Sequence, residues 1–233
     1  MPGPRDFAQT YVTPKTLDRE LEEWMREISP YQWRKIEPFA RGRIALLVID
    51  MTRPFVDEDR PLSSPNARAV VPRVRALVEG FRRTKNPVLW LAQGHHSLAH
   101  DRGKRLSSWW PLPILEGTSD VEPASGLDVG KNEKVIIKRR YSGFFQTDLE
   151  CTLRNLGMEQ VVICGVLTHV CPYATAFDAF SRDFGVYYAA DGTASLNREL
   201  HVAALRNIAG WCGRVMRVQD ILARLKPGGH RQD

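Results

Sequence analysis

The chain lacks the features that mark membrane-spanning, secreted and disulfide-bonded proteins. It has no run of 18 apolar residues, and residues 1–20 contain no apolar segment, so we expect neither a transmembrane helix nor a secretory signal. The 233 residues include only four cysteines, and these show no CxxC spacing. Such cysteines fit neither a disulfide framework nor a zinc site, and they favour a reducing cytoplasm.

A concentrated block of charge is also missing. The chain carries 33 Lys and Arg against 27 Asp and Glu, a net charge of +6 that comes mainly from scattered arginines. A nucleic-acid partner would need a basic stripe or a known binding module, and we find neither. With 43% apolar and 26% charged residues, the composition is that of an ordinary soluble globular protein. We therefore expect no nucleic-acid or membrane partner. We expect a small-molecule substrate, and a local positive charge could bind an anionic group on it.

Short apolar runs alternate with stretches of helical periodicity. The runs predict six strands, at residues 44–49, 87–92, 134–137, 161–164, 185–190 and 214–218. Helices are predicted at 65–83, 148–155, 172–182 and 198–209, with Pro72 suggesting a kink or a later start in the first of them, and residues 219–225 close the domain. Because strands alternate with helices, we expect an α/β fold, a three-layer doubly wound arrangement around a mainly parallel six-stranded sheet.

Two regions depart from this alternation. Residues 1–40 are predicted to form an N-terminal helical arm whose apolar residues, including Leu17, Leu21 and Trp24, recur at spacings of three and four. The arm could cover a sheet edge or pack on a second subunit, and residues 41–227 form the predicted domain. Residues 94–130 are expected to be a loop, and a loop of this length in a compact domain is usually functional.

Polar residues stand where four of the predicted strands end. Asp50 follows the first strand, Gln93 the second and Lys138 the third, while the fourth leads through residues 165–170 to Cys171. In doubly wound sheets, ligands bind outside the carboxyl ends of the strands. We therefore expect these groups to converge on one crevice.

Cys171 has the sequence context of a nucleophile. Pro172 suits a first helical position, which places Cys171 at or beside the helix N-cap. Unpaired N–H groups and the helix dipole stabilise an anion there, so we expect a lowered pKa and a reactive thiol. The alternative is a small buried cysteine that only packs under a strand end.

Three segments resemble the isochorismatase-like hydrolase superfamily, whose cysteine members include nicotinamidases, N-carbamoylsarcosine amidases and ureidoacrylate amidohydrolases. They are residues 45–51, 138–145 and 165–171, the last followed by Thr175, Asp178 and Ala179. The resemblance spans roughly residues 43–218 and implies a Rossmann-like fold and a homodimer or homotetramer. It also implies an Asp–Lys–Cys triad on Asp50, Lys138 and Cys171, and a cis peptide before Leu167. The backbone N–H groups of Leu167 and Cys171 would then form an oxyanion hole.

The resemblance points to two reactions. Residues 91–93, 110–111 and 140–145 are most similar to true isochorismatases, which cleave a vinyl ether and typically have glycine in place of Cys171. Because acyl transfer needs a nucleophile and ether cleavage does not, we favour a cysteine hydrolase. It would cleave a C–N bond of a small amide or ureido/carbamoyl substrate through a thioester intermediate. The alternatives are a vinyl ether hydrolase with Asp50 as general acid, and a non-catalytic scaffold.

Further residues are candidates for binding the substrate. They are Phe55, Gln93, His95, Trp110, Arg140 and Tyr141. Arg139 and Arg140 could bind a substrate carboxylate or lie on a solvated surface. Nicotinamidases bind a metal through an Asp and two His after the equivalent strand. Here Gln93 stands in place of that Asp, so we predict no metal and no cofactor, and we leave the roles of His95, His96 and His100 open.

Overall fold

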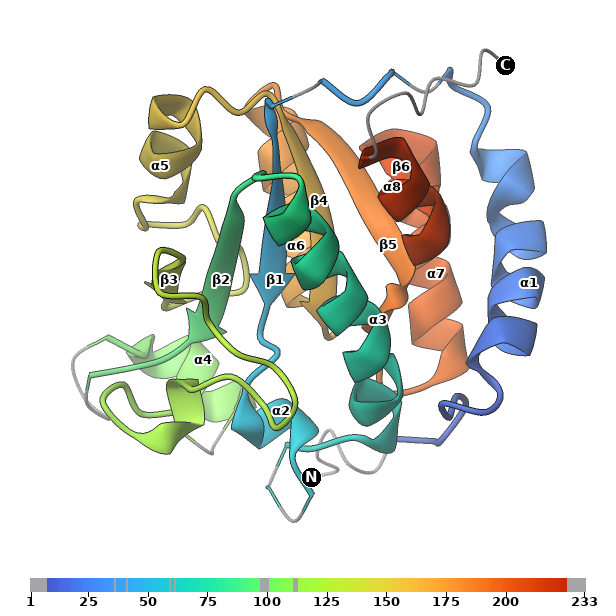
Figure 1. Cartoon of the computed structure of the whole chain (residues 1–233). Coiled ribbons are helices and arrows are strands. Elements are labelled where there is room, and N and C mark those ends of the chain that lie inside the picture. Colours follow the sequence, from blue (N-terminus) through green and yellow to red (C-terminus); the bar gives the residue numbers. More distant parts are fainter. Residues whose placement is uncertain are drawn as a thin grey trace.

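Six strands form one parallel sheet in the order β3-β2-β1-β4-β5-β6 (Figure 1). The computed structural model describes residues 8–35, 37–40, 42–58, 60, 62–96, 101–110 and 113–225. The strands are β1 (Ile44–Ile49), β2 (Val88–Gln93), β3 (Lys134–Lys138), β4 (Gln160–Val166), β5 (Gly185–Ala194) and β6 (Arg214–Met216). Every pairing between neighbouring strands is parallel, which confirms the predicted α/β architecture.

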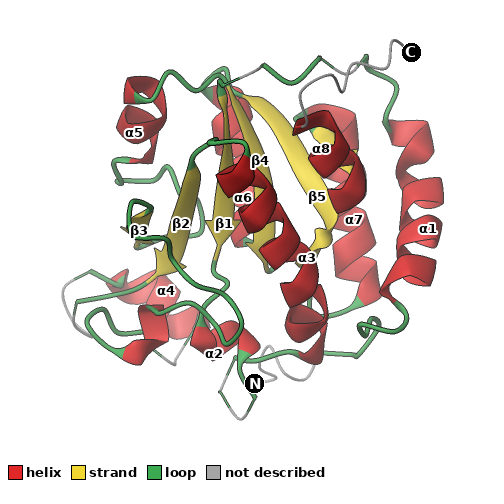
Figure 2. Ribbon diagram, in the orientation of Figure 1, coloured by secondary structure: helices red, strands yellow, loops and turns green. Residues whose placement is uncertain are grey.

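Helices cover both faces of this sheet (Figure 2). One apolar core contains α3 (Pro65–Arg83) and α8 (Val218–Leu225), and the other contains α1 (Leu17–Ile28), α5 (Leu149–Asn155), α6 (Cys171–Ser181) and α7 (Arg198–Trp211). The residues of β1 alternate between the two cores, with Leu46 and Val48 in the first and Leu47 and Ile49 in the second. A strand buried on both faces must be apolar throughout, which is why β1 reads as an unbroken apolar run.

Several element boundaries differ from those predicted. β5 continues to Ala194, beyond its predicted end at residue 190. The helix α3 spans residues 65–83 as predicted, with the Ser64 side chain accepting a hydrogen bond from the N–H of Asn66, so the alternative of a later start is wrong and Pro72 lies inside the helix. The segment after β2 was predicted as loop, but it contains α4 (Gly103–Trp109) and the 3₁₀ turn η3 (Ser119–Val121). Shorter pieces, α2 (Arg53–Val56) and η2 (Ser29–Tyr31), were not predicted either.

The N-terminal helix α1 packs on its own chain. Its buried side chains lie in the same core as those of α7, and the rings of Trp24 and His201 are 4.4 Å apart between centroids. Glu27 of α1 also forms ion pairs with Arg198 and Arg206 of α7. The division of the chain at residue 40 stays a prediction.

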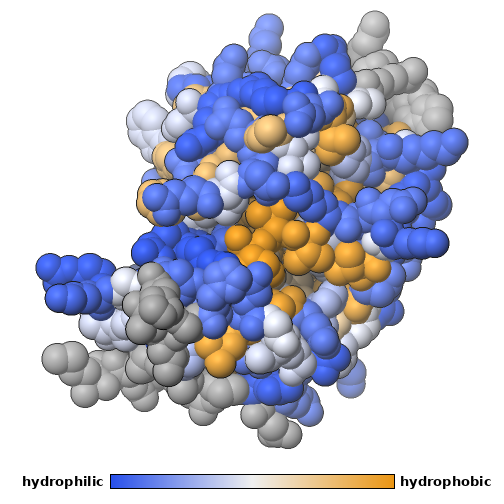
Figure 3. Space-filling model, turned by 90° about the vertical axis from the view of Figure 1, so that its left-hand side faces the viewer, coloured by the Kyte–Doolittle hydropathy of each residue, from blue (hydrophilic) through white to orange (hydrophobic). Residues whose placement is uncertain are grey.

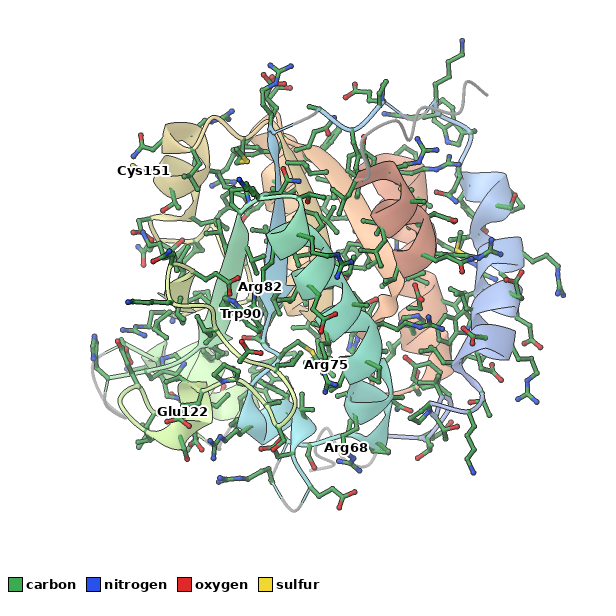
Figure 4. All side chains as sticks on the ribbon, viewed as in Figure 1. Arg68, Arg75, Arg82, Trp90, Glu122 and Cys151 are labelled. Carbon is green, nitrogen blue, oxygen red and sulfur yellow. The ribbon has the colours of Figure 1, made fainter. Side chains whose placement is uncertain are left out.

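Glu133 fixes the edge strand β3 to the rest of the sheet. Its carboxylate accepts hydrogen bonds from Arg82 Nε of α3 at 2.7 Å and from Trp90 Nε1 of β2 at 2.7 Å, two side chains labelled in Figure 4. The N–H of Gly130 donates to the same carboxylate at 2.8 Å. Because Glu133 directly precedes β3, these bonds hold the strand whose far end carries Lys138.

The molecular surface is hollowed on the side that bears β3, α4 and α5. Figure 3 views this side, and hydrophobic residues gather there in a depression bounded by hydrophilic ones. None of the helices in the described ranges is long and apolar enough to cross a membrane.

Gly165 allows β4 to approach the backbone of β1 more closely than any other residue could. Its φ is +115°, and an added Cβ would lie 1.9 Å from the carbonyl oxygen of Ile49. The register of β4 against β5 shifts between Ile163 and Gly165, just before the segment that leads to Cys171. Only glycine adopts this φ at no steric cost and leaves room for the neighbouring backbone.

We therefore expect Gly165→Ala to lower the free energy of unfolding by about 3 kcal/mol or more, because the new side chain needs both a strained φ and a displaced strand. Gly157 offers a matched control, since its φ is +69° but nothing lies within 4 Å of its Cβ position. Gly157→Ala should lower the same quantity by only about 1 kcal/mol. Urea denaturation measures both, and equal losses would contradict this account of Gly165.

Candidate active site

Asp50, Lys138 and Cys171 meet at the carboxyl end of the sheet. Asp50 follows β1, Lys138 ends β3 and Cys171 begins α6. The Lys138 ammonium lies 2.8 Å from Asp50 Oδ2, and both side chains are fully buried. The Cys171 thiol lies close enough to both for Asp50 to raise its pKa and for Lys138 to lower it. The structure thus brings together the three residues that the sequence resemblance selected.

The backbone fixes one oxygen of Asp50, and Lys138 is the charged partner of the other. Asp50 has a φ of +54°, a left-handed conformation that is uncommon for residues with a side chain. Its Oδ1 accepts a hydrogen bond from the N–H of Gln93 at 2.8 Å. Oδ2 is buried and lies 2.8 Å from the Lys138 ammonium, which is its charged partner.

The thiol of Cys171 does not have the lowered pKa that its position at a helix N-terminus predicted. Burial raises its pKa, and the carboxylate of Asp50 raises it further, while Lys138 opposes both. The prediction was wrong because Cys171 is only 7% exposed and faces an anion, and these effects outweigh the helix dipole. The resting group is a thiol, and it needs a base before it can act as a nucleophile.

Lys138 keeps its positive charge in spite of complete burial. Burial by itself lowers its pKa, but Asp50 and Cys171 more than compensate, so the pKa is raised. Gln93 Oε1 accepts a second contact from the ammonium at 2.9 Å. A cation is therefore held next to the sulfur.

The segment between β4 and α6 presents two unused backbone donors. The peptide bond between Val166 and Leu167 is cis, as the resemblance implied. No described residue accepts a hydrogen bond from the N–H of Leu167 or of Cys171. Thr168 is held between them, since its Oγ1 lies 2.8 Å from His201 Nδ1 and its carbonyl accepts from Tyr188 at 2.7 Å. The two N–H groups could bind an anionic oxygen.

His169 faces the protein interior. Its Nδ1 lies 2.6 Å from the hydroxyl of Ser195, and burial lowers its pKa to about 4. The structure gives it no contact with the triad, consistent with leaving it without a catalytic role.

A cavity of about 50 Å³, partly open to solvent, lies in front of Asp50 and Cys171. Five of the six predicted substrate-binding residues line it: Phe55, Gln93, His95, Trp110 and Tyr141. Arg140 does not line it, and this prediction needs correction. Its guanidinium donates to the carbonyl oxygens of Asp101 and Arg139, at 2.9 and 2.7 Å, and so is committed to the backbone. Arg139 likewise pairs with Asp101 and Glu116.

The analysis of the sequence missed several lining residues, above all Arg102. The others are Leu62, Leu106, Ile114, Val166 and Val170. Arg102 is only 5% exposed, its guanidinium donates to the carbonyl of Trp110, and no carboxylate of the described residues pairs with it. The segment 94–130 was expected to shape the pocket, but nothing in its sequence distinguishes Arg102 from Lys104 and Arg105.

The histidines of this segment differ in their surroundings. His95 is buried with its Nδ1 3.2 Å from Asp101, whereas His96 is exposed and lies 3.2 Å from Glu116. His100 lies outside the described residues. Within those ranges no group of three His, Cys, Asp or Glu side chains could hold a metal ion. Independence of metal stays a prediction.

Known proteins resemble this chain over most of its length. Nicotinamidase 3 of Arabidopsis thaliana is 34% identical over 183 residues, which cover 77% of this chain and 86% of that protein. A probable isochorismatase of Pseudomonas chlororaphis is 30% identical over 191 residues, 82% of this chain and 88% of that protein. A cysteine hydrolase from Pseudomonas syringae pv. phaseolicola has the same fold, with a TM-score of 0.78 at 23% identity over 82% of this chain and 95% of that chain.

The family model of the isochorismatase domain matches residues 44–220, a range that contains Asp50, Lys138 and Cys171 together with the cavity in front of them. Because that match covers most of the chain and every strand of the sheet, this protein belongs to the isochorismatase family of hydrolases.

Proposed function

We propose that this protein is a cysteine hydrolase that cleaves a C–N bond of a small amide or ureido/carbamoyl substrate through a thioester on Cys171. The observation that carries the proposal is the placement of the Cys171 thiol, whose pKa is raised, beside the carboxylate of Asp50, whose Oδ2 is fully buried. A charged Lys138 lies 2.8 Å from that oxygen. A nucleophile, its base and a cation are the parts that acyl transfer requires.

In the first half-reaction, Asp50 takes the proton of Cys171, and Lys138 stabilises the thiolate that forms. The sulfur attacks the substrate carbonyl, and the N–H groups of Leu167 and Cys171 bind the resulting oxyanion. One such donor can contribute roughly 3 kcal/mol to the stability of the transition state. The protonated Asp50 then gives its proton to the leaving nitrogen, and the C–N bond breaks.

In the second half-reaction, water replaces the amine. Asp50, again a carboxylate, removes a proton from the water as it attacks the thioester, and the acid product leaves with Cys171 restored as a thiol. Each proton taken by Asp50 in one step is returned in the next. The cycle therefore closes without a cofactor.

Side chains of the cavity support a small, mainly apolar substrate that carries an anionic group. Phe55, Trp110 and Tyr141 supply aromatic surface, and Trp110 Nε1 donates to the Tyr141 hydroxyl at 2.8 Å. Arg102 supplies a buried cation without a carboxylate partner among the described residues. Because a buried charge is stable only when it is paired, we propose that a substrate anion completes this site.

Vinyl ether hydrolysis is the second candidate, favoured by the similarity to a probable isochorismatase. In that reaction Asp50 would act as a general acid, and Cys171 would have no covalent role. From the family resemblance we also propose a cytoplasmic homodimer or homotetramer that acts on a small molecule.

The two reactions differ in whether the substrate becomes attached to the protein. Rapid quenching during turnover of an amide or ureido substrate is expected to trap an acyl group on the peptide that contains Cys171, detected by mass spectrometry. Cys171→Ala should lower kcat by roughly 10⁴-fold. Cys151→Ala is the control, since Cys151 is exposed on α5 and should have no effect. Turnover of isochorismate that survives Cys171→Gly, with no adduct on any substrate, would establish the ether reaction instead.

Removal of the Arg102 charge should raise KM for anionic substrates. Arg102→Met keeps most of the side-chain volume. We expect KM for an N-carbamoyl amino acid to rise about 10- to 100-fold, because a factor of that size corresponds to the free energy of one hydrogen bond to a charged group. The methyl ester of the same compound should show little change. Lys104→Met is the matched control, because Lys104 is an exposed cation in the first turn of the helix that Arg102 precedes. Equal effects on acid and ester would show that Arg102 does not bind the anion.

Activity should not depend on a bound metal, because Gln93 is a poorer metal ligand than a carboxylate. Dialysis against EDTA is expected to leave the rate unchanged, and elemental analysis should find zinc well below one equivalent per chain. Stoichiometric zinc whose removal abolishes activity would refute this prediction.

A further inference from the structure

A chain of hydrogen bonds connects the Lys138 ammonium to a second carboxylate that the mechanism does not use. The ammonium lies 2.8 Å from Asp50 Oδ2, 2.9 Å from Gln93 Oε1 and 3.4 Å from the carbonyl oxygen of Arg140. A fully buried ammonium needs acceptors for its three donors, so the orientation of Gln93 helps to decide where the charge sits.

The direction of every bond in this chain follows from the donor at its start. Lys138 can only donate, so the amide oxygen of Gln93 faces it and the amide nitrogen faces His95 Nε2, at 2.9 Å. An amide nitrogen also only donates, so His95 Nε2 must be unprotonated. The proton of the neutral ring is therefore assigned to Nδ1, which donates to Asp101 Oδ1 at 3.2 Å.

The Asp101 carboxylate, the last acceptor of this hydrogen-bond chain, is held in place by several contacts. Its Oδ2 accepts from the N–H of His96 at 2.8 Å and pairs with Arg139 Nε at 2.9 Å. Burial raises the pKa of Asp101, but the His96 N–H and the neighbouring His95 and Arg139 outweigh it, and the pKa is lowered. Arg139 also donates to the Gly94 carbonyl at 2.8 Å. Both ends of the hydrogen-bond chain, Lys138 and Asp101, are therefore held by residues at the end of β3.

We propose that Asp101 and His95 are positioning residues that act through Gln93 to hold the Lys138 ammonium against Asp50 and Cys171. This inference rests on the proposed function of the triad and assigns His95 a role beyond that of a wall of the cavity. The charged groups around His95 are Asp101, Arg102 and Arg139. Burial lowers the pKa of His95 despite Asp101, so the neutral ring that the chain requires is the form present at neutral pH.

A broken chain would free the Gln93 amide to rotate and to turn its NH₂ toward the ammonium. Lys138 would then move away from Cys171 or lose an acceptor. Because Lys138 is the group that opposes the raised pKa of Cys171, that pKa should rise further. A merely loosened structure has the opposite effect, since it exposes the sulfur and makes it react faster.

Alkylation of the free enzyme by iodoacetamide tests the proposal without a known substrate. The rate of modification of Cys171 is followed by mass spectrometry from pH 6 to 10, with the exposed Cys151 of the same molecules as internal standard. We expect His95→Phe to slow modification of Cys171 about tenfold at neutral pH, the effect of one unit of pKa, and to move its profile to higher pH. Asp101→Asn, which preserves the shape of the side chain, should cause a smaller shift in the same direction. The Cys151 rate should not change.

Lys138→Met separates the proposal from the function on which it rests. Suppose that Lys138→Met slows the modification of Cys171 by iodoacetamide, while His95→Phe and Asp101→Asn leave its rate unchanged. The positioning role is then wrong, and the triad stands. Faster modification of Cys171 in His95→Phe and Asp101→Asn would reveal a structural role only and would likewise overturn the proposal. If Lys138→Met itself has no effect on Cys171, the triad fails and the positioning role fails with it.

Discussion

The arrangement of this site depends on the burial of one ion pair. Asp50 and Lys138 are both removed from water, and an isolated buried charge is far less stable than a paired one. The pair spans β1 and β3, which are not neighbours in the sheet, so Gln93 at the end of the intervening β2 must accommodate it. Gln93 does so with both of its amide atoms and with its backbone N–H, which donates to Asp50 Oδ1. The three strand ends thereby form a single electrostatic unit.

A parallel sheet suits such a unit because all of its strands end at the same edge. β1 and β2 deliver Asp50 and Gln93 there after buried apolar residues, and the more exposed edge strand β3 delivers Lys138. The fourth contribution comes from β4, where Gly165 brings the backbone against Ile49 and the chain continues to the donors of Leu167 and Cys171. The rigid sheet therefore positions the reactive groups, and the segment that contains α4 supplies the remaining cavity wall, including Arg102 and Trp110.

The sequence was sufficient for the fold and for the residues at strand ends, since buried strands must be apolar and parallel strands must end together. It failed where the outcome depends on side-chain burial. Cys171 was expected to be acidic from its place on α6, but a helix terminus that is buried beside Asp50 favours the neutral thiol. Arg140 and Arg102 carry the same group in equally plausible positions. Which of them enters the cavity is decided by carbonyl oxygens brought near by the folding of residues 94–130, and these leave no pattern in the sequence.

The raised pKa of Cys171 also bears on the choice of reaction. An amide nitrogen leaves only with a proton, so a cysteine that was already ionised would provide a nucleophile but no proton for the leaving group. A thiol beside a carboxylate provides both in sequence, because the proton that Asp50 removes is the one that the amine later needs. Ether cleavage has the reverse requirement, since there Asp50 must carry the proton at the start. A neutral thiol beside the Asp50 carboxylate is thus the starting arrangement that the proposed amide reaction requires.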